Sequence, residues 1–198
     1  MKREEFYKDA YPGLKLAERR LLDLLDFYKA QAEEDSDLQP IIYTCSRIKK
    51  PDRMLEKLER RGFEQNLCAA LHNVYDAVGV RAVCAFSDDV YRLVNWLKTR
   101  TEIEIVKEKD YYANPKPNGY RSYHIIVQVS VTPSESYFAE LQIRTIASDF
   151  WATLEHRLKY KKDVPHENVI REELERCALE IVSVDASMQA IRDLLKKE

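Results

Sequence analysis

The stretch VGVRAVCAF, residues 78–86, decides the fold class. It is an almost continuous apolar run whose one charged residue is Arg81, and such a run is typical of a β-strand covered on both faces. Further strands are predicted at 41–49, 101–108, 123–131 and 137–145, and helices at 14–34, 51–61, 87–98, 146–161 and 167–197. This order predicts an α/β (α+β) fold: a mixed sheet of about five strands flanked by helices, in a single domain spanning residues 1–198.

Composition limits how this domain could bind a ligand. Only 4 of the 198 residues are glycine, so a glycine-rich phosphate-binding loop is excluded and side chains must hold any nucleotide. The net charge of −2 gives no overall attraction for nucleic acid. No apolar run reaches the ~18 residues of a membrane span, and the N-terminal MKREEFYKDAY does not resemble a secretory signal. The 4 scattered cysteines form no C-x-x-C pair, which favours free thiols in a reducing cytoplasm.

A basic cluster at residues 47–61 stands out from this weakly acidic background. It contains seven bases and three acids, which gives a local charge of +4. Arg47 and Lys49 are two residues apart on a predicted strand, so they share a face. The bases of the next predicted helix recur at i, i+4, i+7 and i+8 on one side: Arg53, Lys57, Arg60 and Arg61. These two elements either direct their cations at one polyphosphate or form a plain solvated basic face.

The strand YFAELQIRT, residues 137–145, carries polar side chains on one face only. Glu140, Gln142 and Arg144 alternate with apolar residues. They form either an ordinary solvated face or the floor of a site.

Asp76 is a second carboxylate beside apolar sequence. Two carboxylates together with substrate phosphates are a usual way to hold Mg²⁺. Strict alternation would put Asp76 and Arg81 on opposite faces of a strand. A shared site therefore requires the chain between Asp76 and Gly79 to leave regular strand geometry, which a glycine permits.

The loop NPKPNGYRSYH, residues 114–124, combines prolines, cations and aromatic residues. Tyr120 could stack on a base, and His124 could contact phosphate or transfer a proton. Packing is the alternative interpretation of the tyrosine, and a structural role is the alternative for the histidine.

The last predicted helix carries a regular apolar seam. Its members alternate four and three residues apart: Ile170, Leu174, Cys177, Ile181, Val184, Met188, Ile191 and Leu195. This spacing predicts packing against the first helix, an interface between subunits, or both.

Six blocks of sequence together resemble the synthetase domain of RelA/SpoT-type proteins. They are SRIK (46–49), the helix with Lys57 and Arg60, YDAVGVR (75–81), KPNGYRSYH (116–124), ELQIRT (140–145) and DFWATLEH (149–156). The blocks follow the family's order within residues 46–160, and so short a chain is similar to the small alarmone synthetases. No His-Asp dipeptide occurs, so the hydrolase domain of the long family members is not expected.

The resemblance implies a nucleotidyltransferase-like synthetase fold and a specific reaction. The β,γ-pyrophosphate of ATP would pass to the 3′-hydroxyl of GDP or GTP, giving (p)ppGpp and AMP, with Mg²⁺ as the cofactor. Asp76 and Glu140 would be the catalytic and metal-binding residues, and Glu140 would help to activate the 3′-hydroxyl. The implied ATP-binding residues are Arg47, Lys49, Lys57, Arg60, Arg81 and Lys109. The implied GDP- or GTP-binding residues are Lys116, Asn118, Tyr120, His124, Gln142 and Arg144.

The resemblance also implies a homotetramer in the cytoplasm, with the helix at 167–197 as a possible interface. Two other functions stay open. A toxic relative would pyrophosphorylate the 3′ end of tRNA instead of a free nucleotide. A decayed scaffold would bind nucleotide or RNA as a regulator without catalysis.

Overall fold

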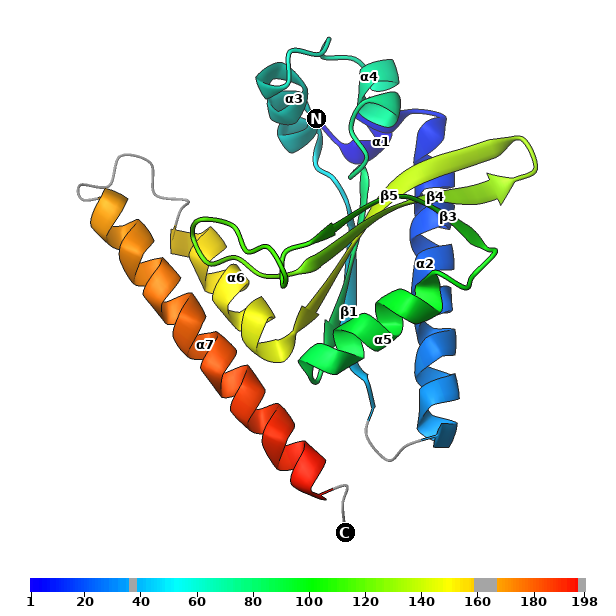
Figure 1. Ribbon diagram of the computed structural model, residues 1–198. Helices are drawn as coiled ribbons and strands as arrows, with labels where there is room; N and C mark the ends of the chain where they lie inside the picture. The colour runs from blue at the N-terminus through cyan, green and yellow to red at the C-terminus, as the bar shows by residue number, and fades with distance from the viewer. Residues whose placement is uncertain (36–38, 159–166, 196–198) are drawn as a thin grey trace.

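The apolar run at residues 78–86 forms β2, Val78–Cys84, near the middle of a five-stranded sheet of order β1-β2-β5-β4-β3 in the computed structural model (Figure 1). The other strands are β1 (Ile41–Ile48), β3 (Ile103–Asp110), β4 (Tyr123–Thr132) and β5 (Glu135–Thr145). β2 and β5 are parallel, and the remaining pairs are antiparallel. The predicted mixed sheet is therefore confirmed.

The structure describes residues 1–35, 39–158 and 167–195. Its helices there are α1 (Arg3–Tyr7), α2 (Ala10–Asp35), α3 (Pro51–Arg60), α4 (Leu67–His72), α5 (Ser87–Leu97), α6 (Ile146–Leu158) and α7 (Glu167–Leu195). The sequence did not predict α1 and α4, because helices of 5 and 6 residues are too short to show helical periodicity. The expected helix ends at 161 and 197 fall outside the described residues.

The two faces of the sheet differ as the alternation along β5 predicts. Leu141 and Ile143 are fully buried in the main core, where α2 and α5 also pack. Each such side chain stabilises the fold by ~1.5–3 kcal/mol. Glu140 and Gln142 point to the opposite face, and the parallel register sets Arg81 of β2 beside Gln142. One face of the sheet therefore builds the core and the other is polar.

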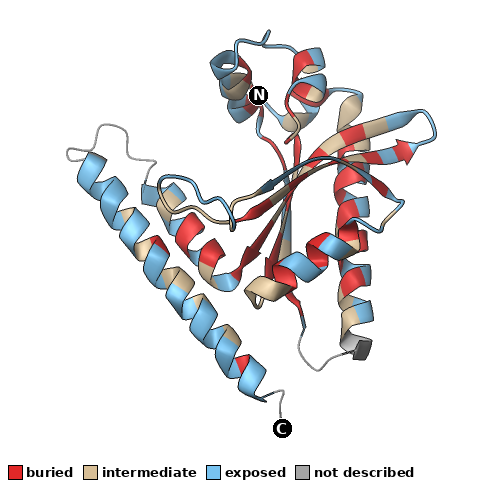
Figure 2. Ribbon diagram, viewed as in Figure 1, coloured by how far each residue is buried: buried red, intermediate tan, exposed pale blue. Residues whose placement is uncertain are grey.

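α7 does not pack against α2, so that prediction for the apolar seam is wrong. It lies against α6 and touches α5, on the side of the sheet away from α2 (Figure 1). The Trp151 indole nitrogen donates to the Leu174 carbonyl at 3.0 Å, which fixes α6 to α7. Much of α7 is exposed (Figure 2), and four seam residues are more than half exposed: Val184, Met188, Ile191 and Leu195.

The N-terminal helix α1 fastens the end of β1. The Tyr7 hydroxyl donates to the Lys49 carbonyl at 3.0 Å, and the Arg3 Nε donates to the Ile48 carbonyl at 2.8 Å. Burial is the main reason that the pKa of Tyr7 is raised, so this hydroxyl stays protonated. The helix therefore holds Lys49, which follows β1, through buried contacts to the backbone.

The four cysteines of the chain are all free thiols. Across the three described ranges, no helix has the length and apolar character needed to cross a membrane.

Candidate active site

Three adjoining pockets open on the polar face of the sheet, and Asp76 lines all of them. The α3 pocket has a volume of about 550 Å³, the β1–β2 pocket about 90 Å³ and the β3–β4 pocket about 350 Å³. Glu140 lines the last two. The two carboxylates singled out in the sequence therefore lie together, at the junction of the pockets.

Asp76 reaches this junction because the chain turns before it enters the sheet. Residues 75–77 form a turn and β2 begins only at Val78. The expected departure from strand geometry is thus confirmed, although Gly79 itself lies inside regular strand. Arg81 and Asp76 both line the β1–β2 pocket, as a shared site requires.

The α3 pocket is lined by cations. Pro51 begins α3 at a favoured early position, and Met54 and Leu58 are fully buried on one side of the helix. The opposite side of the helix turns its bases toward the pocket, as the i, i+4, i+7 spacing predicts. The basic residues around it are Arg3, Arg47, Lys49, Lys50, Arg53, Lys57 and Arg60. A space of this size and charge suits a polyphosphate.

Asp76 is held between two of these cations. Lys49 and Lys57 each place the ammonium nitrogen 2.7 Å from the same oxygen, Oδ2. Burial alone would raise the pKa of Asp76, but the two ion pairs outweigh it and lower that pKa. Burial also lowers the pKa of Lys49. The second oxygen, Oδ1, is buried and has no hydrogen-bond partner among the described residues.

Glu140 is held by polar neighbours on β4 and β5. His124 Nδ1 lies 3.3 Å from Oε1, and the Gln142 amide donates to Oε2 at 2.8 Å. Burial would raise the pKa of Glu140, but the hydrogen bond and charge of His124 and the bond from Gln142 lower it to about 2. The site therefore presents a second carboxylate that is ionised at neutral pH.

Arg47 and Arg81 meet at the β1–β2 pocket. Gly79 sits beneath the Arg47 side chain, since a Cβ at Gly79 would lie 3.5 Å from the Arg47 Nε. Both guanidinium groups line the pocket, so a flat ring between them is compatible with the geometry.

The β3–β4 pocket has a second set of cations. Its basic residues are Lys57, Arg61, Lys107, Lys109 and Lys116, with Tyr75, Tyr111 and His124 beside them. Lys109, expected among the ATP-binding residues, lines this pocket together with Lys116 and His124. A cation set on each side of the carboxylates lets the site hold two phosphate-bearing molecules at once.

The loop between β3 and β4 sets Tyr120 against two residues that line this pocket, His124 and Lys116. The Tyr120 hydroxyl bonds His124 Nε2 at 2.8 Å and accepts from Arg144 Nη2 at 2.8 Å. The Lys116 ammonium lies 4.6 Å from the centre of the Tyr120 ring. The Asn118 amide instead donates to Glu155 of α6 at 2.8 Å. Tyr120 is thus connected to the Glu140 carboxylate through His124, whereas Asn118 anchors the loop.

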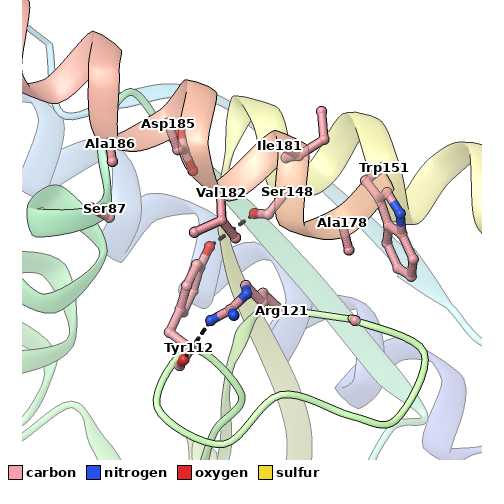
Figure 3. Close-up of a pocket in the computed structure, with 11 residues that line it drawn as sticks. Ser87, Tyr112, Arg121, Ser148, Trp151, Ala178, Ile181, Val182, Asp185 and Ala186 are labelled. Atoms are coloured by element: carbon pink, nitrogen blue, oxygen red, sulfur yellow. Dashed lines mark hydrogen bonds between the residues drawn. The ribbon is translucent and has the colours of Figure 1, made fainter. Parts of the chain in front are cut away.

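A separate, mostly apolar cavity of about 120 Å³ lies between this loop and α7 (Figure 3). The Tyr112 hydroxyl and Ser148 Oγ are 2.9 Å apart at its wall, and Val182 of α7 faces them. At its rim, Gly119 lies so close to α7 that a Cβ there would approach the Ala178 Cβ to 2.4 Å. α6 and α7 therefore form the support on which the loop rests.

Several pocket residues gave no usable signal in the sequence. Arg3 belongs to a helix too short to predict, and His156 ends the matched block 149–156 without a spacing to other histidines or cysteines that would indicate a metal site. Lys107 and Tyr111 lie in a strand and a loop whose register the sequence alone does not fix. The charge run at 47–61 and the helical spacing both pointed to Arg61, but the resemblance gave it no role.

The donor groups present fit a divalent cation that is shared with a substrate. The described part of the chain has no cluster of three or more His, Cys, Asp or Glu side chains that could hold a metal. It does offer the unpartnered Oδ1 of Asp76 and the ionised Glu140 at one junction. Mg²⁺ is commonly bound by one or two carboxylates together with substrate phosphates.

This fold and this site are typical of an enzyme that transfers phosphate groups between nucleotides, and the comparisons with known proteins agree. A family model described as "Region found in RelA / SpoT proteins" matches residues 46–164. The chain is 41% identical over 180 residues to the GTP pyrophosphokinase YwaC of Bacillus subtilis, covering 86% of this chain and 85% of that protein.

Solved structures agree as well. Small alarmone synthetase 1 of Bacillus subtilis, bound to its product pppGpp, superposes with a TM-score of 0.83 at 31% identity, over 92% of this chain and 94% of that one. A GTP pyrophosphokinase family protein of Streptococcus pneumoniae gives 0.86 at 34% identity, over 100% and 97%. The chain belongs to the RelA/SpoT family and has the architecture of its small alarmone synthetases.

Proposed function

We propose that the chain transfers the β,γ-pyrophosphate of ATP to the 3′-hydroxyl of GDP or GTP. It is a GTP pyrophosphokinase, and its products are (p)ppGpp and AMP. The 3′-oxygen attacks the β-phosphorus of ATP, and the bond from that phosphorus to the α,β-bridging oxygen breaks, so AMP leaves with that oxygen. The observation that carries this proposal is the position of Asp76 and Glu140 at the junction of two cation-lined pockets.

ATP occupies the α3 pocket and the β1–β2 pocket in this proposal. The adenine lies between the guanidinium groups of Arg47 and Arg81, which is supported by their shared pocket over Gly79. The triphosphate lies against Lys49, Lys57 and Arg60, which is supported by the cationic lining. Phosphoryl transfer needs mainly positioning and charge neutralisation, and these side chains supply both without a glycine-rich loop.

The acceptor nucleotide occupies the β3–β4 pocket. Its guanine stacks on Tyr120, and its phosphates meet Lys116 and His124, a role supported by the lining of that pocket. Because Lys109 lines the same pocket, we propose that it contacts the acceptor in place of the ATP contact that the resemblance implies. Asn118, Gln142 and Arg144 support the acceptor side through other residues in this proposal: Asn118 anchors the loop on Glu155, Gln142 holds Glu140, and Arg144 holds Tyr120. Glu140 accepts the hydrogen bond of the 3′-hydroxyl and takes its proton as the oxygen attacks.

We propose Mg²⁺ as the cofactor, held by Asp76 and Glu140 together with the ATP phosphates. When bound, the ion offsets the negative charge that the β- and γ-phosphates carry during transfer. The unpartnered Asp76 Oδ1 supports this assignment. Lys49 and Lys57 keep Asp76 ionised and fix its direction through Oδ2.

We further propose a homotetramer in the cytoplasm. The exposed apolar residues of α7 support an interface between subunits. Four free thiols support a reducing compartment.

The acceptor is tested by product chromatography after incubation with Mg²⁺, ATP and one candidate acceptor at a time: GDP, GTP, GMP or tRNA. The proposal expects a 3′-pyrophosphorylated guanine nucleotide and an equal amount of AMP with GDP or GTP. Transfer of label to tRNA alone would contradict the proposal and favour pyrophosphorylation of the 3′ end of tRNA. Nucleotide binding without release of AMP would contradict the proposal and favour a regulator without catalysis.

A further inference from the structure

One buried carboxylate that the reaction leaves unused connects the two nucleotide subsites. Asp149 lies in the first turn of α6 and is only 5% exposed. Its Oδ1 is 2.9 Å from Nη1 of Arg81 and 2.9 Å from Nη1 of Arg144. Its Oδ2 accepts from the Tyr43 hydroxyl at 2.6 Å. Three strands, β1, β2 and β5, therefore converge on a single side chain of α6.

The two arginines have different partners beyond Asp149. Arg81 lines the β1–β2 pocket, where the adenine of ATP is proposed to lie. Arg144 donates to the hydroxyl of Tyr120, the residue proposed to stack on the acceptor's guanine, at 2.8 Å. It also donates at 2.9 Å to the side-chain oxygen of Gln142, which lines the β1–β2 pocket. The Gln142 amide in turn donates to Glu140.

We infer that Asp149 is a positioning residue that sets both the ATP-stacking guanidinium of Arg81 and the acceptor-side guanidinium of Arg144. This inference rests on the proposed function, because it uses the two subsites assigned there. An arginine stacks well on a base only when the plane of its guanidinium group is fixed. An ion pair at one end of the guanidinium fixes the tilt of that plane and leaves both of its faces free to stack. The Asp149 carboxylate supplies one such contact to each arginine, from Oδ1 to Nη1.

Charge explains why an amide cannot replace this carboxylate. One negative charge stands between two guanidinium groups at 2.9 Å each. The Nε atoms of Arg81 and Arg144 are buried and have no partner among the described residues. Without the charge of Asp149, two guanidinium groups on one polar surface have no shared carboxylate between them, and both side chains shift from their positions.

The test is the variant Asp149→Asn, with equilibrium dissociation constants measured separately for α,β-methylene-ATP and for GDP in the presence of Mg²⁺. We expect both constants to rise about tenfold, the size of one lost charge-assisted hydrogen bond. The variant Asp88→Asn is the matched control, because Asp88 is also shared by two arginines, Arg92 and Arg192, away from the site. It should change either constant by less than about twofold.

A double-mutant cycle separates positioning from a merely structural role. In an Arg81→Ala background, Asp149→Asn should no longer weaken ATP-analogue binding but should still weaken GDP binding. In an Arg144→Ala background the pattern should reverse. Loss of both affinities in both backgrounds, or unchanged affinities in Asp149→Asn, would overturn the inference.

If Asp149→Asn does not fold, Tyr43→Phe takes its place. It keeps both ion pairs and frees only Oδ2, so both dissociation constants should rise about threefold. Unchanged constants in a folded Tyr43→Phe variant overturn the inference. Because these are binding measurements, they are independent of turnover: a wild-type chain that binds both ligands and forms no product contradicts the proposed function instead.

Discussion

At the scale of single residues, the site depends on carboxylates that are kept ionised. Asp76 is paired with two ammonium groups on one oxygen, and Glu140 is held by a histidine and an amide. A carboxyl with a pKa of about 2 is a weak general base but a good metal ligand. Glu140 therefore takes the proton of the attacking hydroxyl only as that oxygen bonds to phosphorus, and before that step it holds charge and orients the hydroxyl.

The lowered pKa of Glu140 predicts an acid-dependent contribution to stability. The folded value of about 2 lies below the ~4.3 of an unfolded chain, so the stabilisation is complete above that unfolded value and is lost as the pH falls toward 2. The free energies of unfolding of wild type and Glu140→Gln, measured in urea, should differ most near neutral pH and least at about pH 2–3. A free-energy difference that stays constant or grows on acidification would contradict this linkage.

Individual site residues were predictable where a pattern exposed them. Alternation along β5 placed Glu140 and Gln142 on one face, and helical spacing placed Lys57 and Arg60 on one side of α3. Asp149 could not be assigned a role in this way. Its partners come from three strands far apart in sequence, and only tertiary packing brings them to the start of α6.

At the scale of elements, α6 and α7 hold the loop that carries Tyr120. Tyr120 packs with Trp151 and Ala178, and Asn118 is bonded to Glu155. Of the two neighbours predicted for the apolar seam of α7, the first helix is wrong, and an interface between subunits stays a prediction. Periodicity identifies which face of a helix is apolar, and it contains no information about which element covers that face.

A substitution at Gly119 tests whether the packing of this loop against α7 affects binding of the acceptor. It has a φ of +83° and lies against Ala178, so Gly119→Ala adds both backbone strain and a clash. We expect a loss of stability of ~1–2 kcal/mol from the backbone alone, with more from the overlap, and a several-fold higher KM for GDP at an unchanged KM for ATP. Thermal unfolding and steady-state kinetics measure the two effects.

Gly62→Ala is the matched control for that variant. Gly62 has a φ of +73°, but among the described residues no heavy atom beyond Gly62 and its two chain neighbours lies within 4 Å of the position that an alanine Cβ would take. The variant therefore carries the backbone strain without the clash. It should lower stability and leave both Michaelis constants unchanged. An equal rise of the Michaelis constant for GDP in both variants would argue against coupling between the loop and α7.

At the scale of the whole molecule, the order of the strands in the sheet could not be predicted from the sequence. β2 and β5 are neighbours in parallel, although β3 and β4 lie between them along the chain. Pairing between strands far apart along the chain produces no pattern in the local sequence. The number of strands and their burial do produce such a pattern. The site depends on this pairing, which aligns Glu140 of β5 with Gly79 of β2 and so brings Glu140 close to the turn that carries Asp76.

The exposed apolar side of α7 predicts self-association. Met188 and Ile191 are 52% and 51% exposed, which is unusual for large apolar side chains on one helix face. Met188→Glu should shift the chain from an oligomer toward smaller species in light scattering coupled to size-exclusion chromatography. Ala190→Glu, on the same helix, is the control and should leave the mass unchanged. A wild-type monomer at micromolar concentration would contradict the proposed assembly.

The most direct test of the central claim is the rate of AMP and (p)ppGpp formation by Asp76→Asn and Glu140→Gln with Mg²⁺, ATP and GDP. The account predicts that each variant stays folded and loses all detectable product, because the charge at the junction of the pockets is gone. Asp52→Asn, an exposed carboxylate on α3, should keep wild-type turnover. Near-normal turnover in a folded Asp76→Asn or Glu140→Gln variant would contradict the account.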